Sequence, residues 1–219
     1  MNKTINILSL FLFANVSHAT LISTGITNIS GVAGEESHVV LDNAGVQITS
    51  GFIGLGVFNI DNSAISSLST AQDLSNSFFN ISDTGASGDF LSNFAGAFQF
   101  TISGNTDDTF EGTSTFSGNN AYLVIGDGAT LATSSQFLVW DSCIAFHSAT
   151  PLAGPANIFL DAGAGTTVIG SETTFTFDLS EFGGSATEAA FSTAALVPEP
   201  SSTLLIGLAG IGMTLRRRR

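Results

Sequence analysis

Basic side chains are missing from almost the whole chain. The 219-residue sequence has five Lys and Arg residues, which stand at Lys3 and Arg216 to Arg219, and 18 Asp and Glu residues, of which Glu199 is the last. The 17 acidic residues before Glu199 therefore face no Lys or Arg in the body. Nucleic-acid binding is excluded, because phosphate groups are neutralised by Lys and Arg. We expect the carboxylates to be solvated, hydrogen-bonded by backbone N–H groups and hydroxyls, or screened by cations.

Cysteine, tryptophan and tyrosine are equally scarce. Cys143 is the single cysteine, which excludes an intramolecular disulfide. Trp140 and Tyr122 are the one Trp and the one Tyr, and both lie in strongly apolar stretches. By contrast, the chain has 19 Phe residues. We therefore expect burial of a Phe-rich core, packed between layers, to stabilise the protein.

The first segment has the organisation of a secretory signal peptide. Lys3 provides a charged start, residues 5–16 form an apolar segment, and Ser17 and Ala19 are small. We expect a signal helix over residues 1–19 that signal peptidase removes after Ala19. The mature protein would then begin at Thr20 and be exported.

Alternation of apolar and polar residues is the main pattern of the body, residues 20–184, which is long enough for one domain. Phe98–Ile102 and Phe175–Leu179 place apolar side chains on one face, as half-buried strands do. Further strands are predicted at Val46–Thr49, Phe52–Ile60, Phe110–Phe116, Tyr122–Ile125, Phe137–Trp140 and Asn157–Leu160. Short strands between Gly-, Asn- and Asp-rich turns predict an all-β fold, an antiparallel β-sandwich with a jelly-roll-like topology.

Three connecting segments carry predictions of their own. Asp127-Gly128 predicts a hairpin turn between Tyr122–Gly126 and a strand at Ala129–Ala132. Residues 185–196 are small and polar, and we expect a linker between the body and the C-terminal segment. Apolar residues also recur near helical spacing in a Ser-rich segment, at Ile65, Leu68, Ala71, Leu74 and Phe78. This spacing leaves a short helix or a long loop open.

No catalytic arrangement stands out. Cys143 and His147 are the one neighbouring thiol and imidazole, but four residues of a strand span roughly 13 Å, too far for a nucleophile and its base. A buried Cys and a loop His are the simpler interpretation. A Ser-His-Asp set could use His38 or His147, yet the Gly-x-Ser-x-Gly elbow is absent. Many carboxylate pairs exist and none is selected as a glycosidase pair. We expect no enzymatic activity and no catalytic residues.

Oxygen-rich loops are the best metal candidates in the sequence. One expected loop contains Asp107 and Asp108, and another contains Asp83 and Asp89. Neither has the EF-hand spacing. Asp and Asn also form turns and cap helices, which is the alternative. These four residues are weak candidates for Ca²⁺ binding, and otherwise we expect no cofactor.

The C-terminal segment, residues 197–219, combines three features in a fixed order. Pro198, Glu199 and Pro200 come first, an apolar run from Thr203 to Leu215 follows, and Arg216 to Arg219 end the chain. About 13 apolar residues fall short of the about 20 that a membrane-crossing helix needs, so we expect a short hydrophobic helix that anchors the protein transiently. The positive-inside rule places the arginines on the cytoplasmic side of the inner membrane and the body outside it.

This order resembles the PEP-CTERM sorting domain of exported and surface proteins of bacteria. The resemblance covers residues 197–219 and leaves the body unrecognised. It implies that Pro198, Glu199 and Pro200 are recognised by a membrane-embedded exosortase, which releases the protein or transfers it toward the extracellular matrix. A plain tail anchor is the alternative.

The residues and the resemblance together predict an acidic protein that reaches the cell surface or extracellular matrix. We expect a structural or adhesive role, in which polar strand faces and loops contact extracellular polysaccharide, with divalent cations as bridges. The alternative is a secreted carbohydrate-binding module or a carbohydrate-active enzyme on the same sandwich. Two convergent carboxylates in a cleft would favour the enzyme, and an exposed row of aromatic rings would favour the module.

Overall fold

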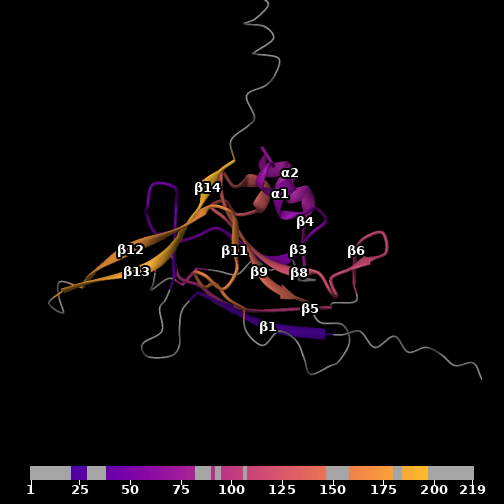
Figure 1. Ribbon diagram of the computed structural model, residues 1–219, viewed down its shortest axis with the longest axis horizontal. Helices are drawn as coiled ribbons and strands as arrows, with labels where there is room; N and C mark the ends of the chain where they lie inside the picture. The colour runs from indigo at the N-terminus through magenta and orange to yellow at the C-terminus, as the bar shows by residue number, and fades with distance from the viewer. Residues whose placement is uncertain are drawn as a thin grey trace, which may run out of the picture.

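The computed structural model describes residues 21–28, 38–81, 90–91, 95–105, 108–146, 158–179 and 184–196. The expected signal helix and the expected C-terminal hydrophobic helix both lie outside these residues. Within them the fold consists of strands with two short α-helices and one 3-10 turn (Figure 1). None of the helices in this part of the chain is long and apolar enough to cross a membrane.

A central antiparallel sheet organises the body. Its strand order is β11-β9-β8-β3-β4, and β14 also pairs with β9. The bounds are β3 Phe52–Phe58, β4 Phe78–Asn80, β8 Asn120–Gly126, β9 Gln136–Ala145, β11 Thr166–Ile169 and β14 Ala194–Ala195. The apolar stretches of β3, β8 and β9 are buried on both faces. Such strands lie inside a layered fold, not at its surface.

One face of the central sheet packs on a second sheet. This sheet has the order β10-β1-β5, in which β1 (Leu21–Thr27) is antiparallel to β5 (Gln99–Asn105) and parallel to β10 (Ile158–Phe159). Ile26, Phe98 and Ile158 meet the alternate side chains of the central strands in one core. The expected all-β sandwich with an apolar, Phe-containing core is therefore confirmed.

The opposite face is covered by short helical segments (Figure 1). These are α1 (Asn62–Ser66), α2 (Ala71–Ser77) and the 3-10 turn η1 (Leu131–Thr133). Ile65, Leu74 and Leu131 bury their side chains against Val124 and Val139 of the sheet. The Asp61 and Thr70 side chains cap the two α-helices by accepting backbone N–H bonds. The Ser-rich segment is thus two short helices, one of the two outcomes that its spacing left open.

A third sheet and a small hairpin extend from this body. The sheet has the order β12-β13-β2. β13 (Gly184–Ser192) is antiparallel to β12 (Ser171–Leu179) and parallel to β2 (Val39–Leu41). Figure 1 shows β12 and β13 as a ribbon that projects from the body. The hairpin consists of β6 (Thr109–Glu111) and β7 (Ser114–Thr115).

Four local predictions are wrong. Residues 46–49 contribute only an isolated bridge between Gln47 and Leu41. The single strand predicted at 110–116 is the β6–β7 hairpin, because Gly112 at φ 61° turns the chain. Residues 129–132 enter η1 and are not a strand, because Thr130 and Thr133 form a capping box. Residues 185–196 are not a linker, because they form β13 and β14.

Candidate functional site

Residues 193–196, which directly precede the C-terminal segment, are held firmly on the body. Ala194 and Ala195 pair with β9, and the Thr193 hydroxyl donates to Gln136 Oε1 over 2.9 Å. The Thr193 N–H donates to the Leu41 carbonyl, and Leu196 packs against the helical side of the core. The sorting tripeptide Pro198, Glu199 and Pro200 begins two residues later. It lies outside the described residues, as do Arg216, Arg217, Arg218 and Arg219.

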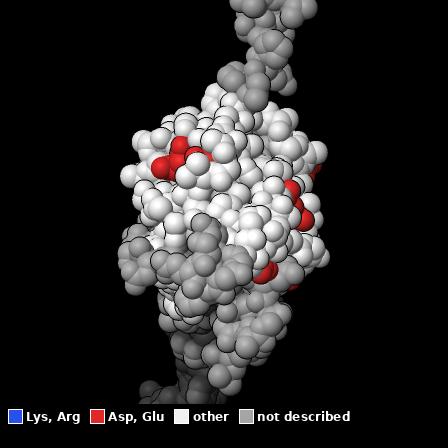
Figure 2. Space-filling model, turned by 90° about the vertical axis from the view of Figure 1, so that its left-hand side faces the viewer, with Lys and Arg blue, Asp and Glu red and all other residues white. Residues whose placement is uncertain are grey.

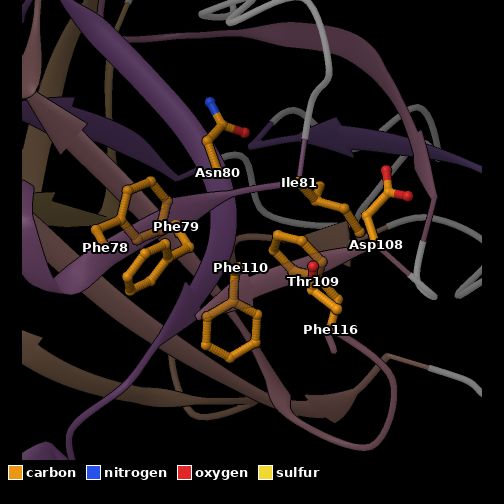
Figure 3. Close-up of a pocket in the computed structure, with 8 residues that line it drawn as sticks. All are labelled: Phe78, Phe79, Asn80, Ile81, Asp108, Thr109, Phe110 and Phe116. Atoms are coloured by element: carbon orange, nitrogen blue, oxygen red, sulfur yellow. The ribbon is translucent and has the colours of Figure 1, made fainter. Parts of the chain in front are cut away.

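An aromatic groove lies at the edge of the central sheet. It has a volume of about 500 Å³ and is formed by β4 and the β6–β7 hairpin. Its walls are Phe78, Phe79, Asn80, Ile81, Asp108, Thr109, Phe110 and Phe116. Figure 3 shows aromatic rings from both elements on one side of the groove, with the polar ends of Asn80 and Asp108 directed toward the other. The groove therefore offers apolar ring surface next to polar groups.

The rings of this groove form a continuous row. Phe79 and Phe110 have centroids 4.9 Å apart, Phe110 and Phe116 are 5.3 Å apart, and Phe116 contacts Phe146 at 6.0 Å. Phe116 and Phe146 are buried, whereas Phe79 and Phe110 are half-buried. Tilted pairs at these separations are favourable for aromatic rings. The buried pair thus fixes the position of the two rings that reach the surface.

Two backbone features position the groove. Gly56 lets β4 approach β3, because a Cβ atom at this position would clash with the Phe79 carbonyl oxygen. The amide of Asn59 donates to Glu111 Oε2 over 2.9 Å and fastens the β6–β7 hairpin to the end of β3. These two contacts hold β4 and the β6–β7 hairpin against β3, and so fix the two walls of the groove.

Several described carboxylates accept hydrogen bonds from neutral donors. Asp42 Oδ1 accepts the N–H groups of Ala44 and Val46, each at 2.8 Å. Hydrogen bonds from the Ser63 hydroxyl and the Ala64 N–H lower the pKa of Asp61. The expectation that hydroxyls and backbone N–H groups hold the acids is confirmed at these positions. Figure 2 shows the acidic side chains of one face as separate patches without Lys or Arg.

Asp127 is held in the same way. Burial opposes ionisation there, but hydrogen bonds from the Ser135 hydroxyl and from the N–H groups of Ser135 and Gln136 lower the pKa of Asp127. These bonds close the connection between β8 and β9. The predicted two-residue hairpin at Asp127-Gly128 is wrong, because the connection runs from Gly126 to Gln136 and contains η1.

A buried polar network joins α1 to the central sheet. Asp141, 3 % exposed, accepts from the amides of Asn62 and Asn120 and from the Cys143 N–H. The Tyr122 hydroxyl donates to Asn62 Oδ1 over 2.8 Å. Burial and the nearby Asp141 charge raise the pKa of Tyr122 to about 12. A phenol with this pKa stays protonated at neutral pH, so Tyr122 acts as a hydrogen-bond donor in a network that orients α1.

Cys143 departs from the sequence prediction. The sequence predicts a buried side chain, but Cys143 is exposed and has φ 57°. The cause is a shift of register between β8 and β9 after Asn120, where the Asp141 carboxylate accepts the Cys143 N–H. The thiol lies 3.8 Å from the Thr166 hydroxyl. His147, the other half of the considered pair, lies outside the described residues.

Of the four metal candidates, the described residues include Asp108. Asp108 borders the aromatic groove, and Asp83, Asp89 and Asp107 lie outside the described residues. Within the part of the chain that the structure describes, no three His, Cys, Asp or Glu residues are placed to hold a metal ion. His38 is buried, with Nε2 3.5 Å from Asp161 Oδ1.

The protein is an acidic β-sandwich whose last strand, β14, is followed directly by the C-terminal segment. Residues 196–219 of that segment match the family model described as the PEP-CTERM protein-sorting motif. The protein is thus an exported substrate of exosortase, anchored transiently in the membrane during sorting. The body has no recognised family. No curated protein and no solved structure matches the chain.

Proposed function

We propose that the protein is a structural or adhesive component of the cell surface or extracellular matrix, and that its aromatic groove binds polysaccharide. The row formed by Phe79, Phe110 and Phe116 is the observation that carries this proposal. The faces of phenyl rings pack against the apolar C–H surface of a sugar, while amide, carboxylate and hydroxyl groups at the rim bond its hydroxyls. Signal peptidase would remove residues 1–19, and exosortase would complete delivery.

The charge of the body selects the class of polysaccharide. With no Lys or Arg between residues 20 and 215, the groove has no fixed cation to pair with uronate or sulfate groups. A neutral polysaccharide is therefore the ligand that fits. Anionic polysaccharides would bind only through divalent cations such as Ca²⁺, which Asp108 at the rim could share, and a chelator should then abolish their retention.

This proposal favours binding over catalysis. The groove contains one carboxylate, Asp108, whereas hydrolysis of a glycosidic bond uses a pair. Asp141, the buried acid, belongs to the separate network with Asn62 and Tyr122. We propose that the body has no enzymatic activity. The arrangement is closer to a carbohydrate-binding module than to a hydrolase.

Affinity electrophoresis in gels that contain neutral polysaccharides tests the proposal. The variant Phe110→Ala should bind about tenfold more weakly, since it removes a ring that packs on the ligand and on Phe79. Phe175→Ala is the matched control, because Phe175 is a half-buried ring that pairs with Phe177 in another sheet. Equal retardation of the wild type and Phe110→Ala, or no retardation by any neutral polysaccharide, would contradict a groove-based role.

A further inference from the structure

A single residue, Val197, separates the sorting tripeptide from Leu196, the last described residue of the body. Leu196 is held by packing, and each further residue adds at most about 3.6 Å of reach. Two residues of chain span at most about 7 Å and four at most about 14 Å, which limits how far from Leu196 an enzyme that holds Pro198 or Pro200 can stand. An enzyme that grips the tripeptide is brought against the surface of the body from which the segment leaves. This follows from the sorting motif and does not depend on polysaccharide binding.

That surface contains an uncharged hollow. It has a volume of about 400 Å³ and is lined by the end of α1 (Ser66–Leu68), by the end of β11 (Val168–Gly170) and by β14 with Leu196. Figure 1 shows the helices and β14 on the same side of the body, and the end of α1 borders the hollow together with β14. No carboxylate lines the hollow, although the chain carries 18 acidic residues. The hollow is partly apolar and uncharged. Such a surface is suited to contact with the part of a membrane protein that lies at the membrane–water interface.

Detachment of β14 is the competing way to give the enzyme access. It would free residues 194–196 and add about 10 Å of reach. It would also break the pairing of Ala194 and Ala195 with β9 and expose Leu196. The buried Thr193 sets the limit of such a movement, since its hydroxyl and N–H are both bonded inside the fold. With β14 in place, the enzyme meets the hollow.

We propose that the hollow between α1, β11 and β14 is the surface on which exosortase docks while it holds Pro198, Glu199 and Pro200. The enzyme would then recognise a folded surface in addition to a linear motif. Charge placed at the hollow would be buried without a partner on docking, and should slow processing.

The test follows processing of the full chain in a host that expresses its exosortase. Pulse-labelled precursor and product are separated by mass for the double variant Ser67→Glu with Ala195→Glu, both exposed lining positions. The matched control is Thr174→Glu with Ser185→Glu, two exposed positions on the β12–β13 ribbon. We expect the hollow variant to be processed about tenfold more slowly and the control to match the wild type. Unchanged urea unfolding of the purified hollow variant excludes a loss of folding.

A second variant distinguishes docking on the hollow from simple obstruction of the enzyme by the body. Ten Gly and Ser residues inserted between Leu196 and Val197 leave residues 197–219 intact but move them from the hollow. If the hollow is a docking surface, the insertion slows processing and cancels the effect of the two Glu substitutions. If the body only obstructs the enzyme, the insertion accelerates processing. Acceleration, or equal rates for the hollow variant and the wild type, would overturn the proposal.

Discussion

Asp127 holds the connection between β8 and β9 without a cation, and its removal has a calculable cost. Its carboxylate accepts three hydrogen bonds, from Ser135 N at 2.6 Å, Ser135 Oγ at 2.6 Å and Gln136 N at 3.1 Å. At about 1 kcal/mol each, Asp127→Ala should lower the free energy of unfolding by about 3 kcal/mol. Asp127→Asn keeps a carbonyl oxygen for the two backbone donors and should cost only about 1–2 kcal/mol.

The same carboxylate gives a pH dependence of known sign. The pKa of Asp127 is lower in the folded protein than its ordinary value of about 3.9. Its stabilisation is therefore present above about pH 4 and is lost as pH falls through the folded pKa. Urea unfolding, followed by fluorescence of the buried Trp140, should show the gap between wild type and Asp127→Asn closing below pH 4. A cost of Asp127→Ala below about 0.5 kcal/mol, or a gap that is constant with pH, would refute the reasoning.

Four further results are expected. Leu123→Ala removes a fully buried side chain and should lower the free energy of unfolding by about 2–5 kcal/mol in urea titration; a smaller loss would contradict its core position. Gly56→Ala should separate β4 from β3, lowering both the urea midpoint and retention by polysaccharide, and unchanged values would argue against the close approach. Cys143 should react with maleimide in the native protein, one label per chain by mass; protection until unfolding would contradict its exposure. Trypsin should not cut between residues 20 and 215 of the unfolded protein, so any internal tryptic fragment would mean a different chain.

The long strands could be predicted because their own side chains determine them. β3, β8 and β9 are rich in large apolar residues, and burial of these residues decides their structure. β13 was missed because its small and polar residues, Ser185 to Ala190, carry no such signal. It becomes a strand through nine pairs with β12 and a parallel contact with β2. In such a segment the neighbouring strands determine the secondary structure, and a single sequence does not show which strands become neighbours.

The aromatic groove could not be predicted for a related reason. Phe79 and Phe110 are 31 positions apart and meet only through the fold. The sequence pattern predicts one strand from Phe110 to Phe116, whereas Gly112 turns the chain between β6 and β7. The position of Gly112 between two short polar stretches was the available signal for a turn. The sorting motif was predictable because it is linear, and its recognition needs residue order and no tertiary contact.

The absence of Lys and Arg from the body and the hydrogen bonding of its acidic side chains are physically connected. An ion pair at the surface weakens as salt screens it, whereas a hydrogen bond from a backbone N–H to a carboxylate is short and local. Asp42 and Asp127 are held by such bonds within loops, and Asp141 by amides inside the fold. The body therefore keeps these anchors without any Lys or Arg. Its remaining negative charge attracts cations, and under the function proposed above an anionic polysaccharide would bind only through a divalent metal.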